Sequence, residues 1–305
     1  MSRVIIIDPP LYKHPFWDPV RYAQPLGLWS IASHLERFGH DVRLLCAPSE
    51  DWHHQRLIRP EGSSEFDFYH RSKAFALARG GSADAMLSRF AARLSDAYLY
   101  VGMPLDAIVR EVEAFAPDLV GISLIASCHH QSVIDVASAL RRGGYDGPLV
   151  VGGQHATALP ERVLRDAGGD IDWLVRGESE EIMVALADAP TNVDALRHTP
   201  GVCYLDEDGR FHKNRRPRFF DLADITLPQA SVLDRIPMPK VPTHTLDTHG
   251  RRYTAIMFSV GCHNTCSFCY SPQMRGRVRQ LPKASVRAIL EDLWAYGYRE
   301  LVLQD

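Results

Sequence analysis

Short apolar runs alternate with amphipathic stretches from Val4 to about Ala187. This alternation is typical of a parallel β-sheet wrapped by helices, in which each apolar run forms a buried strand. The predicted strands are residues 4–7, 41–46, 119–125, 149–151 and 173–175. The predicted helices are residues 26–38, 105–115, 130–142, 160–167 and 179–187. This half of the chain therefore alternates strand and helix five times.

Five such units predict an α/β fold built on a flavodoxin-like, doubly wound parallel sheet. Sheets of this kind bind their ligands outside the carboxyl ends of the strands. We therefore expect the turns after the first, third, fourth and fifth strands to form a binding site together. Residues 50–103 break the alternation with His53-His54, a polar stretch and a weakly periodic segment that predicts a helix around 85–99. We interpret them as an insertion that covers the sheet.

The pattern changes after residue 200. Two short apolar segments, 202–205 and 210–213, flank an acidic turn that ends in Gly209, which predicts a hairpin. A proline-rich linker follows, and then a strand at 253–259, a helix at 282–296 ending at Gly297, and a strand at 301–303. The predicted domains are 1–200 for the sheet, 201–250 for the hairpin and linker, and 251–305 for the last segment.

Composition and charge narrow the function. The 305 residues are 46% hydrophobic and 23% charged, which excludes a disordered or fibrous chain. The 34 basic and 37 acidic side chains give a net charge of −3, so no nucleic-acid partner is indicated. No apolar run approaches the roughly 18 residues of a membrane span, and the first residues do not form a signal peptide. We expect a cytoplasmic protein that acts on a small-molecule substrate, without a membrane partner.

Three of the six cysteines lie within eight positions, at Cys262, Cys266 and Cys269. The C-x3-C-x2-C spacing lets one loop bring three thiolates to a metal centre. Structural zinc normally has four protein ligands, and a fourth would have to come from His263 or a distant residue. Three cysteines without a fourth indicate an iron–sulfur cluster with one open iron. The isolated cysteines, Cys46, Cys128 and Cys203, are interpreted as small buried apolar residues.

The run from Gly261 to Tyr270 resembles the signature of the radical S-adenosylmethionine enzymes. That resemblance implies a [4Fe–4S] cluster on the three cysteines, with S-adenosylmethionine chelating the open iron. It places Phe268 near the adenine and Asp305 near the methionyl amino group. Reductive cleavage of S-adenosylmethionine would then give a deoxyadenosyl radical. A full barrel of this family needs more strands than residues 251–305 supply, so we expect a fragment too short to be active alone.

The segments before the cysteines resemble cobalamin-binding radical enzymes in particular. Ser123-Leu124-Ile125 is followed, after 26 intervening residues, by Gly152-Gly153, the spacing of an SxL motif and its glycine pair. Glycines would leave room for the nucleotide tail of the cofactor. The DxHxxG motif is absent after the first strand, and His14 is interpreted as a loop residue. The resemblance predicts cobalamin contacts at Ser123, Leu124, Gly152, Gly153, Gln154, His155, Thr157, Gly177 and Glu178.

We therefore expect a B12-dependent radical enzyme of the methyltransferase or cyclase type, served by a one-electron reductant such as flavodoxin or ferredoxin. The alternative is a non-catalytic cobalamin-binding module whose cysteine loop holds structural zinc or a vestigial cluster. His155 would either contact the corrin or satisfy the backbone at a helix start. His53-His54 and His129-His130 are interpreted as surface or cap residues, because adjacent histidines point in different directions. Three arginines after the loop form either a solvated face or a functional basic stretch, at positions 275, 277 and 279.

Overall fold

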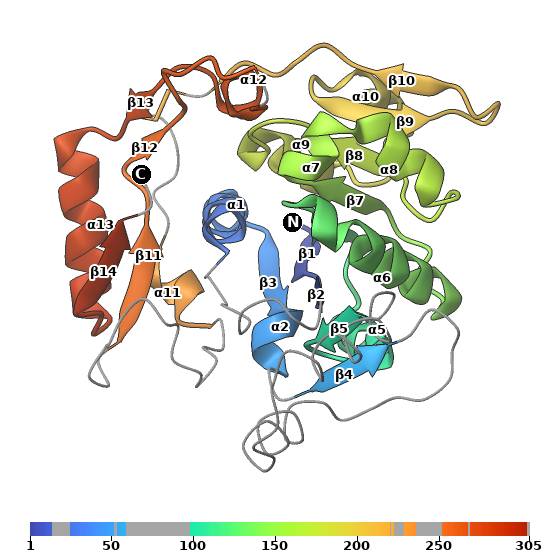
Figure 1. Ribbon diagram of the computed structural model, residues 1–305, viewed down its shortest axis with the longest axis horizontal. Coiled ribbons are helices and arrows are strands. Elements are labelled where there is room, and N and C mark those ends of the chain that lie inside the picture. The colour runs from blue at the N-terminus through green and yellow to red at the C-terminus, as the bar shows by residue number, and fades with distance from the viewer. Residues whose placement is uncertain are drawn as a thin grey trace, which may run out of the picture.

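The computed structural model describes residues 1–13, 25–51, 54–58, 98–219, 221–222, 229–235, 252–267 and 269–303. Within these ranges a seven-stranded sheet forms the centre of the molecule (Figure 1). Its strands are β1 (Arg3–Asp8), β3 (Asp41–Cys46), β6 (Leu119–Ser123), β7 (Leu149–Gly152), β8 (Trp173–Val175), β9 (Val202–Leu205) and β10 (Phe211–Lys213). The helices that accompany it are α1 (Leu26–Arg37), α2 (Ala47–Glu50), α5 (Leu105–Phe115), α6 (His130–Arg142), α7 (Gln154–Ala158), α8 (Pro160–Asp166), α9 (Glu180–Asp188) and α10 (Val193–His198).

The strand order confirms the predicted topology. Parallel strands run in the order β3-β1-β6-β7-β8, which is the flavodoxin-like arrangement. The predicted hairpin, β9 and β10, is also present, and β9 extends the sheet by pairing antiparallel with β8. Because Ser123 pairs with Gly152 and Gly152 with Val175, the strands β6, β7 and β8 end together at one edge.

Two apolar cores cover the two faces of the sheet. On one face, α1 and α9 pack on the even-numbered side chains of β1, such as Val4 and Ile6. On the other, α5, α6 and α8 pack on Ile5 and Ile7. Successive side chains of a strand point to opposite faces, so the continuous apolar run of β1 supplies both cores.

The C-terminal segment is built on the first core. Its elements are α11 (Ala230–Leu233), β11 (Tyr253–Ile256), β12 (Ser259–Val260), α12 (Ser271–Arg275), β13 (Arg279–Gln280), α13 (Lys283–Ala295) and β14 (Glu300–Leu303). Figure 1 shows α1 between the main sheet and this segment. The backbone N–H of Gln229 donates to Ser33 Oγ of α1 (3.0 Å), and that of Ala230 donates to Asp292 Oδ2 of α13 (2.7 Å). The short helix α11 thus ties α13 to α1.

Three expectations need correction. Cys128 is exposed, so the interpretation of the isolated cysteines as buried residues is wrong for Cys128, although it holds for Cys46 and Cys203. The predicted strand 253–259 is two strands, since β11 pairs in parallel with β14 while β12 pairs antiparallel with β13. The end of the helix predicted around 85–99 is wrong, because Tyr98 and Leu99 belong to β5 (Tyr98–Val101). Strand β5 pairs with β2 (Leu11–Lys13) and β4 (Gln55–Ile58) in a separate antiparallel sheet. The rest of that predicted helix, His14 and His53 lie outside the described residues.

None of the helices in the described ranges is long and apolar enough to cross a membrane. The longest of them, α6 and α13, have 13 residues each and so extend about 20 Å. A span of the hydrocarbon layer needs about 20 apolar residues.

The first core gives a direct test of packing on α1. Leu35 is fully buried in it, whereas Phe38, at the end of the same helix, is 58% exposed. We expect Leu35→Ala to lower the free energy of unfolding by about 2–5 kcal/mol, because a cavity replaces the lost side chain. Phe38→Ala should cost less than about 1 kcal/mol. Urea unfolding followed by circular dichroism measures both, and equal losses would contradict this assignment of the core.

Candidate functional site

The turns after β6 and β7 are bonded to each other through their backbones. The N–H of Leu124 donates to the carbonyl of Gly152 (2.7 Å), and the N–H of His155 donates to the carbonyl of Leu124 (3.1 Å). Ser123 and Leu124 are buried, while Ile125 is 52% exposed at the rim. Exposed apolar surface beside buried backbone is what the face of a large flat cofactor would cover.

The glycine pair is required by the protein itself. Gly153 has φ +123°, and a Cβ there would lie 2.5 Å from the carbonyl oxygen of Leu124. A Cβ at Gly152 would lie 2.8 Å from a methyl group of Val175. The turn after β7 therefore packs directly on the end of β6 and on β8, which gives a second reason for the glycines beside the predicted room for a cofactor tail.

A side chain joins the turn after β7 to the turn after β8. Thr157 is 3% exposed, and its Oγ1 accepts the backbone N–H of Gly177 at 3.0 Å. Gly177 has φ +82°, a conformation that favours glycine. The predicted contacts Thr157 and Gly177 therefore hold two loops together, and Glu178 follows directly, just before the N-cap of α9.

His155 belongs to a chain of polar side chains. Its Nδ1 lies 2.9 Å from Ser127 Oγ, its Nε2 lies 3.0 Å from His130 Nδ1, and His130 Nε2 lies 3.0 Å from Asp166 Oδ2. Hydrogen bonds, first from Arg162, hold the pKa of Asp166 below its usual range. An ionised carboxylate only accepts, so His130 donates from Nε2, His155 donates to His130, and Ser127 donates to His155.

This series of hydrogen-bonded side chains bears on the roles of His155 and His130. Both ring nitrogens of His155 are engaged, with Ser127 and with His130. Burial, together with the nearby His130, lowers the pKa of His155, so its neutral ring forms these two hydrogen bonds. The interpretation of His130 as a plain surface or cap residue is wrong, because it connects His155 to Asp166. The pairing crosses 25 residues of sequence, and adjacency alone carries no signal for it.

Asp8 is a residue of this edge that the sequence interpretation passed over. It ends β1 beside Cys46 of β3, and it is only 8% exposed. Burial raises its pKa from 3.8 to about 7. A lone acid closing an apolar strand was the signal available for it in the sequence.

The cysteine loop lies between β12 and α12. Cys266 is exposed, Cys262 and Cys269 are half-buried, and the thiols form no disulfide. Position 261 requires glycine, because its φ is +111° and a Cβ there would meet the carbonyl of Arg277. The N–H of Cys262 donates to the carbonyl of Gly276 (3.2 Å), which closes the base of the loop. Cys269 Sγ accepts the N–H of Ser271 at 3.4 Å.

The donor chemistry of the loop fits a metal centre held by three thiolates. In the described part of the chain, however, no three His, Cys, Asp or Glu side chains lie close enough to hold a metal ion. A centre here requires the tip of the loop to draw the three thiols together. Phe268 and Asp305, the residues predicted to contact S-adenosylmethionine, lie outside the described residues.

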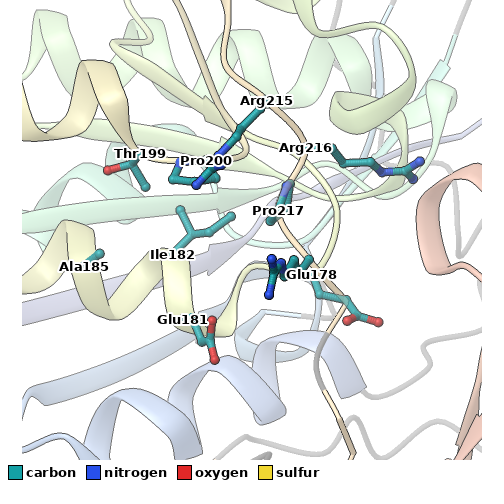
Figure 2. Close-up of a pocket in the computed structure, with 10 residues that line it drawn as sticks. Glu178, Glu181, Ile182, Ala185, Thr199, Pro200, Arg215, Arg216 and Pro217 are labelled. Carbon is teal, nitrogen blue, oxygen red and sulfur yellow. The ribbon is translucent and has the colours of Figure 1, made fainter.

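The segment after the loop reaches the edge of the main sheet. Tyr270 donates from its hydroxyl to the carbonyl of Thr157 (3.4 Å). Arg279 forms a two-pronged ion pair with Glu178, and both side chains are largely buried, 21% and 14% exposed. Glu178 also borders a pocket of about 440 Å³ between α9 and residues 215–218. Figure 2 shows its carboxylate turned away from Glu181.

Residues 84–187 match the B12 binding domain family. The chain is 23% identical to cytidylyl-2-hydroxyethylphosphonate methyltransferase of Streptomyces wedmorensis, over 100% of this chain and 54% of that protein. It is 26% identical to hopanoid C-3 methylase of Methylococcus capsulatus, over 88% of this chain and 40% of that protein. The chain thus spans about half the length of these relatives.

Two solved structures share this fold. The radical S-adenosylmethionine methyltransferase TsrM from Kitasatospora setae, with cobalamin and a [4Fe–4S] cluster bound, superposes with TM-score 0.60 at 19% identity, over 100% of this chain and 48% of TsrM. The cobalamin-dependent radical enzyme OxsB, with aqua-cobalamin and S-adenosylmethionine bound, gives TM-score 0.60 at 12% identity, over 100% of this chain and 34% of OxsB. Residues 84–187 thus match a B12 binding domain, and the chain as a whole is similar in fold to cobalamin-dependent radical S-adenosylmethionine enzymes.

The B12 binding domain match and the shared fold agree with the predicted recognition and fold, while each predicted contact residue stays a prediction. The structure brings the turns after β6, β7 and β8 together, with Gln154 exposed among them. It also brings the cysteine loop of the C-terminal segment to that same edge through Tyr270 and Arg279. The proposed domain boundaries likewise stay a prediction.

Replacing Gly153 tests the packing reason for the glycine pair without any cofactor. We expect Gly153→Ala to destabilise the cofactor-free chain by about 3 kcal/mol, because positive φ and a backbone clash add. Gly168→Ala is the control: it also has positive φ, but nothing lies within 4 Å of a Cβ there, so it should cost about 1 kcal/mol. Thermal melting of both variants decides, and equal shifts would show that the close approach to Leu124 is unimportant.

Asp8 predicts a pH dependence. Its raised pKa means that the folded chain holds the proton more tightly than the unfolded chain, so the destabilising penalty is full above about pH 7 and fades toward pH 3.8. Asp8→Asn should therefore be more stable than the parent at pH 8, with the difference shrinking as the pH falls to 4. Urea unfolding at a series of pH values measures this. A difference that is constant with pH would refute the buried, protonated acid.

Proposed function

We propose that this chain binds cobalamin at the carboxyl edge of β6, β7 and β8, and a [4Fe–4S] cluster with S-adenosylmethionine at Cys262, Cys266 and Cys269. The observation that carries the proposal is the meeting of these two places: Arg279 and Tyr270, which follow the cysteine loop, contact Glu178 and Thr157 in the turns of the edge. A radical centre and a cobalamin must face each other to act on one substrate.

Methyl transfer is the reaction we favour. The relatives named above include two methylating enzymes, and TsrM is a methyltransferase. When bound, the cluster and S-adenosylmethionine supply one-electron radical chemistry, and cobalamin supplies a transferable methyl group. OxsB shows that the same fold occurs in an enzyme not named as a methyltransferase, so cyclisation or rearrangement is the second candidate.

The residues of the edge have separate tasks in this proposal. Ile125 and Gln154 are exposed and would meet the corrin, while Ser123 would bond the buried tail of the cofactor. Leu124, Gly152, Gly153 and Gly177 shape the turns. His155 holds Ser127 and the start of α7 in place and stays neutral. Since both of its ring nitrogens are engaged, it does not ligate cobalt from below.

The cysteine loop and the partners complete the proposal. The three cysteines would hold the cluster, and Phe268 and Asp305 would contact S-adenosylmethionine. A one-electron reductant of the flavodoxin or ferredoxin kind would deliver electrons to the exposed loop, and a small molecule would be the substrate.

Cluster binding is tested by anaerobic reconstitution with iron and sulfide. We expect a reducible [4Fe–4S] electron paramagnetic resonance signal that shifts on adding S-adenosylmethionine. Cys266→Ala should abolish it, because the remaining two thiols cannot hold the cluster. Cys128→Ala, which removes an exposed thiol outside the loop, should leave it unchanged.

Other outcomes identify the alternatives. Four-coordinate zinc without iron would indicate a structural metal loop, and a cluster indifferent to S-adenosylmethionine would indicate an electron carrier. Equilibrium dialysis with hydroxocobalamin tests the other site, and absence of binding would contradict the proposed edge.

A further inference from the structure

The three arginines after the cysteine loop differ sharply in their surroundings. Arg277 is exposed, and Arg275 contacts the sulfur of Met257 at 3.8 Å. Arg279 is largely buried, and both of its terminal nitrogens reach the carboxylate of Glu178. The three arginines therefore do not share one role: Arg277 is solvated, whereas Arg279 forms an ion pair with one specific partner, Glu178.

Arg279 is fixed on several sides. One terminal nitrogen also donates to the carbonyl of Arg275, at the end of α12 (3.1 Å), and the guanidinium lies 5.1 Å from the centre of the Phe219 ring. A Cβ on Gly276 would lie 2.6 Å from that same ring, so Phe219 packs against the base of the loop as well. A planar guanidinium held by a ring and by two parallel bonds to a carboxylate has a defined orientation.

Arg279 also sits at the foot of the cysteine loop. It pairs with Val260 in the two-stranded ladder of β12 and β13, and the loop emerges between these two strands. Its partner Glu178 follows Gly177, whose N–H is bonded to Thr157. A continuous path of contacts therefore runs from the turns of the predicted cobalamin edge to the base of the cluster loop.

We propose that Arg279 is a positioning residue: together with Glu178 it clamps the cysteine loop onto the cobalamin edge, so that cobalamin binding and the order of the loop are coupled. This inference rests on the proposed function for the identity of the cofactor. The role of Glu178 is then to anchor the clamp, in place of the direct cobalamin contact predicted for it. Tyr270 adds a second, weaker contact to the same edge.

The clamp itself is tested by hydrogen–deuterium exchange of the full chain without cofactors. We expect Arg279→Gln to raise amide exchange in residues 259–281 by about fivefold, since a largely buried, bidentate pair is lost. Arg277→Gln is the matched control and should match the parent. Exchange in β1 and β3 should be unchanged in both variants, which separates a released loop from a misfolded protein.

Charge reversal adds a rescue. Arg279→Glu alone should release the loop, and the double variant Glu178→Arg with Arg279→Glu should recover most of the protection. No change in Arg279→Gln, or no recovery in the double variant, would overturn the clamp.

Hydroxocobalamin tests the coupling. Added to the parent, it should protect residues 259–281 further, and in Arg279→Gln it should bind within about threefold of the parent affinity without protecting the loop. Equal protection of the loop in both proteins would overturn the coupling. If the parent does not bind hydroxocobalamin, both the coupling and the proposed function are wrong. The exchange experiment without cofactors still tests whether Arg279 and Glu178 clamp the loop.

Discussion

The close approach of the Gly153 backbone to Leu124 is the constraint on which the site depends. It presses the turn after β7 onto the end of β6, at a distance that excludes any side chain. That contact fixes the start of α7, and with it His155 and Thr157. Thr157 then holds the turn after β8 through Gly177. The three turns form one hydrogen-bonded rim, because each is bonded to its neighbour.

The rim in turn contacts the C-terminal segment. The path continues from Gly177 to Glu178, and from there to Arg279 at the foot of the cysteine loop. On the opposite side of the segment, α11 connects α13 to α1 through Asp292 and the backbone of residues 229–230. The loop is thus located by two attachments, one to the edge of the sheet and one to its covering helix. Side chains of β11 and α13 join the first core, so folding of the segment and of the sheet is shared.

Local signals in the sequence were enough for the parallel sheet, the hairpin and the cysteine loop. Apolar runs that follow a proline, such as β6 after Pro117 and β7 after Pro148, define strands without reference to distant residues. Pairing between distant strands could not be predicted from the sequence. Strand β2 pairs with β5 across about 90 residues, and the local periodicity of the sequence does not indicate which strands pair. The same holds for Arg279, whose partner lies 101 residues away. A side chain's partner depends on the fold, and only the fold brings these charges together.

The electrostatics of the edge distinguish it from a phosphate site. Nucleotide-binding sheets of this class present free N–H groups at a helix start and attract negative charge there. Here the N–H of His155, at the start of α7, is spent on the carbonyl of Leu124. His155 is kept neutral, Asp8 holds its proton up to about pH 7, and the charge of Glu178 is balanced by its ion pair with Arg279, so the edge offers little net charge. A nearly uncharged rim with exposed Ile125 suits a broad, weakly charged ring system better than a phosphate. The physical character of the edge therefore agrees with a corrin, on grounds independent of the motif that first indicated it.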